Sequence, residues 1–214
     1  MKKSIIIFST AAAIALVLTL FMYYPNRSAV SQNTASSSLA PIKEVGIDLE
    51  YPADFADNRI LMGASHNVFV GKVMAQIGSQ ERGIGPETQF SVVPILNIKG
   101  HLSGAVIVDQ AGGVLNGVSY YIEGGALLLK PGATYLLATR YNPQEKWYTL
   151  NPSRSGSQFI INDPDADVAT LSTIAQNDIR VKALEAAYPN EILLNADVRN
   201  NNALNSYKSA HPSL

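Results

Sequence analysis

The sequence predicts a mainly β protein, a small antiparallel β-barrel with a C-terminal helical segment, preceded by an N-terminal transmembrane helix or signal peptide. Three observations predict it: a long apolar run near the amino end, short alternating segments between residues 66 and 161, and a helical pattern beginning at Asp163. The 214 residues, 47% of them hydrophobic, suffice for one core plus appendages. The expected divisions are an anchor or signal peptide at 1–26, a flexible tether at 27–47, the barrel at 48–162, the helical segment at 163–206 and a tail at 207–214.

The amino end predicts export. Lys2 and Lys3 precede an uncharged run whose apolar body, Ile5 to Tyr24, would span about 30 Å as a helix, the thickness of a bilayer's hydrocarbon core. This length favours an uncleaved single-pass anchor in the cell membrane, with an extracytoplasmic domain, over a signal peptide cleaved near Ala29. Cleavage would instead release a secreted protein. The Ser- and Ala-rich stretch that follows is typical of a tether.

Alternation and turn residues predict seven short strands. These are Asn67–Ile77, Thr88–Ile98, Ala105–Val108, Val118–Ile122, Ala133–Tyr141, Lys146–Leu150 and Gln158–Ile161. Pro94 cannot donate to a strand ladder and marks an edge or a bulge, while Pro131-Gly132 fits the centre of a type II turn. The expected barrel core contains Val73, Phe90, Val92, Leu96, Ile98, Ile107 and Leu137. Because no helical pattern interrupts these segments, we expect a closed or sandwiched sheet.

A helix is expected after the last strand. Asp163 can serve as its N-cap and Pro164 fits its first position, and the apolar pattern continues to Tyr188 before Pro189. Charged residues, including Asp178 and Lys182, interrupt the apolar arc. Either the helix breaks near Gln176-Asn177, or the charges pair along its rim.

The stretch "NIKGHLSGAVIVDQAGG", residues 97–113, is rich in glycine but does not match a phosphate-binding loop. Gly100, Gly104, Gly112 and Gly113 have neither the dinucleotide spacing nor a following helix pattern, and no Walker-type lysine is present. These glycines are therefore expected to end strands.

Several runs resemble a known superfamily. They are "VFVGKV" (68–73), "TQFSVVPILNIKG" (88–100), "AVIVDQAGG" (105–113) and "LLLKPGATYLLAT" (127–139). Over about residues 60–161 the chain resembles bacterial exported domains with the OB-type barrel of the tissue-inhibitor-of-metalloproteinase and netrin-module superfamily. The resemblance implies an OB-like β-barrel. The eukaryotic inhibitors of this superfamily chelate zinc through an N-terminal cysteine, and this chain has no cysteine, so the resemblance does not carry inhibition over.

The residues that could carry catalysis are few. His66, His101 and His211 form no close pair and cysteine is absent, so we expect no metal, no cofactor and no catalytic residue. A net charge of -1 argues against a nucleic-acid partner. An envelope-polymer hydrolase, with Asp109 and Glu123 as its candidate carboxylates, stays as an alternative, as does a protease-inhibitor-like protein.

Aromatic residues suggest binding instead. The candidate ligand-binding residues, all on or beside predicted strands, are Tyr120, Tyr141, Trp147 and Tyr148. OB-type barrels bind ligands on a sheet face and its loops, and aromatic rings suit that use, although they also serve to fill a barrel. The sequence therefore predicts a membrane-tethered, non-catalytic binding or interaction module whose partner is an envelope protein or glycan.

Overall fold

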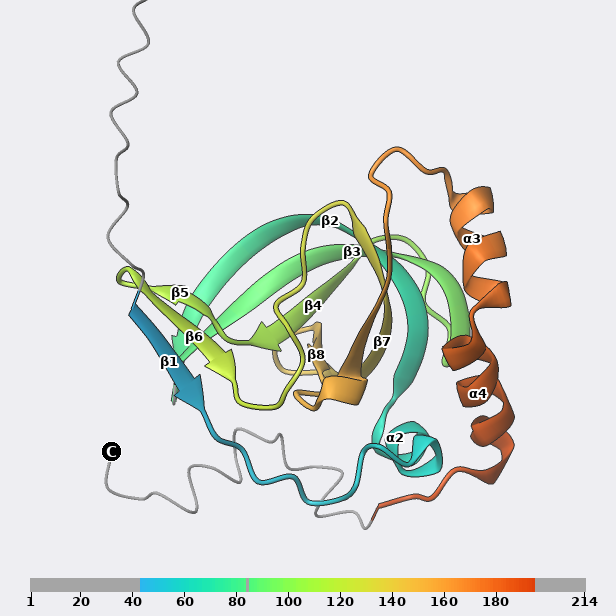
Figure 1. The fold of residues 1–214 in the computed structure, drawn as a ribbon, viewed down its shortest axis with the longest axis horizontal. Helices are drawn as coiled ribbons and strands as arrows, with labels where there is room; N and C mark the ends of the chain where they lie inside the picture. Colours follow the sequence, from blue (N-terminus) through green and yellow to red (C-terminus); the bar gives the residue numbers. More distant parts are fainter. Residues whose placement is uncertain (1–42, 84, 195–214) are drawn as a thin grey trace, which may run out of the picture. The chain divides into compact units, whose positions relative to one another are not determined.

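The computed structural model describes residues 43–83 and 85–194, and in this part five strands close into a β-barrel, which confirms the mainly β prediction (Figure 1). In spatial order the barrel strands are β2 (Asn67–Arg82), β3 (Gly85–Lys99), β4 (Val106–Ala111), β8 (Trp147–Leu150) and β7 (Ala133–Asn142). Pairing of β2 with β7 closes the ring. All neighbouring pairs are antiparallel except β4 and β8, which run parallel.

Alternating side chains give each barrel strand an interior and an outer face. On β7, for example, Leu137 points into the barrel while its neighbour Leu136 points outward. The fully enclosed interior holds Phe69, Val73, Phe90, Val92, Val108 and Leu137, among others. Four of the seven predicted core residues are thus confirmed: Val73, Phe90, Val92 and Leu137.

The prediction was wrong for the other three, and for two of them, Leu96 and Ile98, the reason is a bulge between the long strands. Val70 of β2 pairs with Leu96 of β3, but the next residue, Gly71, pairs with Pro94, so the register of the two strands shifts by one residue at this point. Pro94 therefore lies beside a bulge, and Leu96 and Ile98 pack outside the barrel against the helical layer. Ile107 lies on the outer face opposite Ser91 and is exposed.

Gly71 is needed where β2 crosses the barrel interior. A Cβ atom at this position would lie 2.6 Å from Cγ1 of Val92 and 2.9 Å from the ring of Phe69. Glycine in a strand often marks such a close approach.

Three helices cover the outer face of β2, β3 and β7 (Figure 1). They are α2 (Asn58–Ala64), α3 (Val168–Asn177) and α4 (Ile179–Ala187), which is followed by a short 3-10 turn, η2 (Tyr188–Asn190). The second apolar core, between helices and sheet, includes Leu61, Met62, Val68, Val70, Leu136, Ala138, Ala175, Val181 and Leu184. This side of the barrel is therefore sealed by apolar packing.

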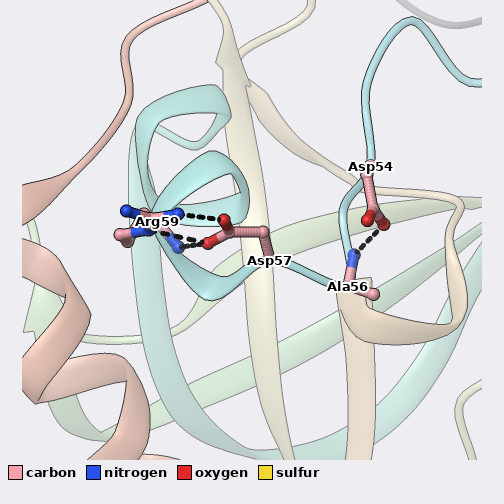
Figure 2. Close-up of polar contacts among 4 residues, drawn as sticks. All are labelled: Asp54, Ala56, Asp57 and Arg59. Carbon is pink, nitrogen blue, oxygen red and sulfur yellow. Dashed lines mark hydrogen bonds and ion pairs between the residues drawn. The ribbon is translucent and has the colours of Figure 1, made fainter.

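Helix α2, which the sequence pattern did not predict, begins at a carboxylate cap (Figure 2). Asp57 accepts a hydrogen bond from the backbone N–H of Arg59 at 2.8 Å and also binds the Arg59 guanidinium. One turn earlier, Asp54 accepts the N–H of Ala56 at 2.9 Å. These two carboxylates turn the chain into the helix just before β2.

The carboxyl helical segment starts and breaks at aspartates. The predicted start at Asp163 was wrong: its carboxylate caps a loop by accepting N–H groups from Asp165 and Ala166, and the N-cap of α3 is Asp167. Asp178 then ends α3 and caps α4, so of the two alternatives the helix break is found.

A smaller sheet flanks the barrel. It consists of β1 (Lys43–Ile47), β6 (Val118–Ile122) and β5 (Gly113–Leu115), with β1 parallel to β6. The expected tether therefore reached too far, since residues 43–47 form β1. The last strand, β9 (Ser157–Asn162), follows a 3-10 turn, η1 (Arg154–Gly156), and pairs with β7.

The turn predicted at Pro131-Gly132 is present. Gly132 has a φ of +85°, and the N–H of Ala133 donates to the carbonyl of Lys130 at 3.2 Å. The predicted anchor at 1–26 lies outside the described residues. None of the helices within residues 43–83 and 85–194 has the length and apolar composition of a membrane span.

Candidate functional site

Polar side chains gather on the outer face of the barrel, on the parts of β2, β3, β4 and β8 that the helices leave uncovered. Gln80 lies opposite Glu87 across β2 and β3, and Gln89 lies opposite Asp109 across β3 and β4. Glu87 and Asp109 are therefore diagonal neighbours on the same face of two adjacent strands. Long side chains in such positions are close enough to interact. We call Arg82, Glu87, Asp109, Glu145 and Trp147 the carboxyl cluster.

Its two central carboxyl groups are buried. The exposed fraction is 3% for Glu87 and 1% for Asp109, although acidic side chains are almost never fully buried unless they are paired. Among the described residues, Oδ1 of Asp109 and Nε2 of Gln80 have no hydrogen-bond partner of normal geometry. The cluster thus keeps unused hydrogen-bonding capacity inside the protein.

Burial also controls the protonation of this pair. Burial raises the pKa of Glu87, and burial together with the neighbouring charge of Glu87 raises the pKa of Asp109 to about 8. Two carboxyl groups this close and this dry do not both ionise at neutral pH. We therefore expect the pair to keep one proton, and thus a single negative charge, at neutral pH.

Arg82 covers the pair and joins two turns. Its Nε lies 3.4 Å from Oε2 of Glu87, its guanidinium forms an ion pair with Glu145, and its Cζ lies 4.9 Å from the ring centroid of Trp147. Arg82 ends β2 at the β2–β3 hairpin tip, whereas Glu145 lies in the β7–β8 turn. We call the contact of Arg82 with Glu145 and Trp147 the clasp.

The β7–β8 turn is shaped to present Glu145. The side chain of Asn142 accepts the N–H groups of Gln144 and Glu145, at 3.2 and 3.3 Å. Lys146 then adopts a left-handed backbone, with a φ of 60°, and its N–H donates to the carbonyl of Asn142 at 2.8 Å. Hydrogen bonds within the turn thus fix the position of Glu145 independently of its ion pair with Arg82.

The predicted aromatic residues do not form one platform. Tyr141 and Tyr148 face each other across β7 and β8, with ring centroids 5.1 Å apart. Trp147 points to the opposite face of β8, where only 7% of it is exposed beneath Arg82. Tyr120 lies on β6 in the smaller sheet and packs against the core there.

The two carboxylates considered for a hydrolase are not partners of each other. Asp109 has Glu87 as its carboxyl neighbour, whereas the Glu123 side chain lies over Gly46 of β1. The predicted strands ended at Ile77 and began again at Thr88, so Arg82 and Glu87 were missed. Glu145, which directly precedes the predicted strand Lys146–Leu150, was also missed. One signal was present: Asp109 directly follows the apolar run "AVIV", where a carboxyl group is unexpected.

Among the described residues, no histidine or glycine belongs to the carboxyl cluster. Nδ1 of His66 accepts the N–H of Tyr141 at 3.1 Å, and His211 lies outside the described residues. In the part of the chain that the structure describes, no group of three or more His, Asp or Glu side chains could hold a metal ion. Gly100, Gly112 and Gly113 have positive φ angles beside strand ends, and no helix follows them.

The chain matches no protein family model and no curated protein sequence. The function is therefore inferred from the geometry of the site.

Proposed function

We propose that this protein is a membrane-tethered, extracytoplasmic and non-catalytic binding module, built on an OB-like barrel, whose partner is an envelope protein or glycan. The ligand would contact the outer face of β3, β4 and β8 between the β2–β3 and β7–β8 turns, which we call the binding face. Export of this domain is inferred from the apolar run at residues 5–24.

One observation carries the proposal: two turns from distant parts of the sequence flank the same helix-free barrel face. The strand order β2-β3-β4-β8-β7, with β4 parallel to β8, supports an OB-like barrel. In such barrels, the face of the second and third strands and the adjoining loops bind oligomeric ligands. Here those strands are β3 and β4, and the loops are the two turns joined by the clasp.

The side chains of the binding face suit an uncharged polar ligand. Gln89, Ser91 and Thr149 are half-buried and offer amide and hydroxyl groups, and Ile107 adds an exposed apolar contact. Hydrogen bonding next to a small apolar surface is suited to either a glycan or a protein segment.

The paired carboxyl groups are the observation that favours the alternative, a hydrolase acting on envelope polymers. Glycosidase carboxyl groups stand about 5–10 Å apart on either side of the substrate. Glu87 and Asp109 instead interact with each other beneath Arg82, which favours binding over hydrolysis. A protease-inhibitor-like activity has only the superfamily resemblance in its favour.

The test compares two exposed isoleucines, Ile107 on the binding face, 38% exposed, and Ile179 on α4, 80% exposed. Full-length protein in detergent, unchanged or with Ile107→Arg or Ile179→Arg, is titrated calorimetrically with soluble cell-wall glycan fragments. In parallel, a photo-crosslinking residue at position 107 or 179 in cells reports protein contacts. The proposal expects either a loss of glycan affinity in Ile107→Arg alone, or a specific protein adduct formed from the crosslinker at position 107 and not from the one at position 179.

Equal behaviour at the two positions, in both arms, would contradict the binding face. Turnover of the glycan fragments that is abolished by Asp109→Asn would instead favour the hydrolase.

A further inference from the structure

The turn between β5 and β6 consists of Asn116 and Gly117, which the proposed function does not use. Leu115 and Val118 pair across the turn, and both turn residues are exposed and have positive φ angles, 50° and 76°. These are the features of the type I′ turn that an Asn-Gly pair favours. Figure 1 shows the turn at the end of the smaller sheet, on the side of the molecule away from α3 and α4. We propose that Asn116 is a site of spontaneous covalent modification, at which the side-chain amide is lost and an isoaspartyl linkage forms in the backbone.

The reaction needs only these two residues, base and water. Base removes the amide proton of Gly117, and the nitrogen attacks Cγ of Asn116 to form a new C–N bond. The bond between Cγ and the side-chain nitrogen breaks, and this nitrogen takes up a proton and leaves as ammonia. The product is a five-membered succinimide ring.

Hydrolysis of the ring completes the modification. Water that attacks the former side-chain carbonyl restores the normal backbone and leaves aspartate. Water that attacks the main-chain carbonyl leaves isoaspartate, in which the backbone runs through Cγ and the main-chain carbonyl becomes the free carboxylate. In both products one amide is exchanged for one negative charge, and no electrons are transferred.

Asn116 is the only asparagine in the chain that is followed by glycine. A side chain on the following residue would crowd the attacking nitrogen, and a Cβ added at Gly117 would meet no heavy atom within 4 Å. Two other asparagines in loops, Asn142 and Asn151, precede proline, which has no N–H proton to lose. The remaining asparagines of the described residues precede a charged or β-branched residue; they are Asn58, Asn67, Asn97, Asn162, Asn177 and Asn190.

The turn has to open before the ring can form, because a type I′ turn directs the next backbone nitrogen away from the side chain of its first central residue. Strand β5 is three residues long and, among the described strands, pairs only with β6. Short strands at the edge of a sheet open at a low cost in free energy, and glycine rotates freely. Opening of this turn therefore leaves the barrel folded.

Isoaspartate would change the smaller sheet. It places an extra atom in the backbone of a two-residue turn, and the length of the turn sets the register of the hairpin. We therefore expect the pairing of Leu115 with Val118 to be lost after modification. Strand β6 also pairs with β1, so the loss of structure should be confined to β5.

The experiment follows full-length protein in detergent as it ages in mildly alkaline buffer, folded or unfolded in urea. Peptide mapping by mass spectrometry detects deamidation, and labelling by an isoaspartyl methyltransferase detects isoaspartate. In the folded protein we expect a gain of one mass unit together with methyl acceptance at Asn116, at a rate proportional to the hydroxide concentration. The rate should be higher in urea, where no turn has to open. Asn116→Gly keeps the capacity for a positive φ but has no amide, and it should give no such product at this position.

Reaction in urea with none in the folded protein over the same period would show that the fold protects the turn and would overturn the inference. Faster conversion of Asn142 or Asn151 than of Asn116 in the folded protein would do the same. The unchanged protein decides the outcome, so the test does not depend on whether Asn116→Gly folds. No ligand takes part, and the result is therefore independent of the comparison of Ile107→Arg with Ile179→Arg.

Discussion

The outer surface of the barrel is closed in two different ways on its two halves. On the helix-covered half, Val70 and Leu136 pack against apolar residues of α2 and α4. On the other half, Glu87 and Asp109 are buried just as deeply beneath Arg82 and beside Trp147. Strands β2 and β3 run through both halves, so a single pair of strands experiences both environments (Figure 1).

The difference predicts that the helix-covered half stabilises the fold at any pH near neutrality, whereas the contribution of the other half to stability changes with pH. Burial of apolar surface stabilises a fold to the same extent across the neutral pH range. A buried carboxyl pair costs free energy, and its cost changes when a proton binds or leaves. The helix-covered half should therefore be insensitive to pH, and the carboxyl cluster should account for most of the pH dependence near neutrality.

The largest loss of stability is expected on the helix-covered half. Leu136→Ala removes a buried side chain from the core between helices and sheet, and we expect the free energy of unfolding to fall by about 2–5 kcal/mol. The loss should be the same at pH 6 and pH 8. Urea unfolding at both pH values measures it, and a strongly pH-dependent loss would contradict the separation of the two halves.

The next largest effect is the pH dependence of the unchanged protein. The pKa of Asp109 is raised in the folded state, so between about pH 4 and 8 the folded state binds more protons than the unfolded chain. This contribution is fully present below about pH 4 and is lost as pH rises towards about 8, a change on the order of a few kcal/mol. Asp109→Asn should flatten the slope between pH 5 and 8.

Other carboxyl groups do not obscure that window. The pKa values of Asp57, Asp167 and Asp178 are lowered by hydrogen bonds at helix caps, so their contributions are lost only as pH falls into the acidic range. Urea unfolding at intervals of one pH unit gives the free energy of unfolding as a function of pH. If this pH dependence is the same for the unchanged protein and Asp109→Asn, the hypothesis that the pair keeps a proton is contradicted.

A smaller effect is expected inside the barrel that both halves share. Gly71→Ala places a Cβ 2.6 Å from Val92, and overpacking of this kind costs about 1–3 kcal/mol. Thermal unfolding should show a lower midpoint for Gly71→Ala, while the paired substitution Gly71→Ala with Val92→Ala should recover part of it. No recovery would mean that the strain lies elsewhere.

The smallest effect is expected at the clasp. Glu145→Gln removes one exposed ion pair with Arg82, which should change stability by about 0–1 kcal/mol. Raising the salt concentration should shrink this difference, because salt screens exposed charges. A loss well above this range would show that Glu145 supports the turn in some other way.

Local patterns in the sequence predicted most of the barrel. The bounds of β6 agree with the expected strand, and β7 and β8 differ from theirs by one residue each, because apolar and turn residues mark these segments clearly. Pro94 indicated an edge or a bulge, but the change of register that the bulge causes was not predictable. That change moves Leu96 from the interior to the helix-covered face.

The candidate site was only partly predictable. Trp147 and Asp109 were singled out separately, for binding and for hydrolysis, and the structure places both in the carboxyl cluster. Arg82 and Glu87 were missed, since the predicted strands stopped at Ile77 and began again at Thr88, short of the hairpin that presents these two residues. The pairing of Glu87 with Asp109 depends on the register between two strands about twenty residues apart, which alternation within either strand does not reveal.

The most direct test of the buried proton is a carbon-13 NMR titration of the side-chain carboxyl groups, with Asp109→Asn and Glu87→Gln used to assign the signals. We expect a coupled titration for Glu87 and Asp109, with one proton lost near pH 8, and this step should vanish in either variant. If both carboxyl groups instead titrate below about pH 5, the pair holds no proton at neutral pH and the account of the carboxyl cluster is contradicted.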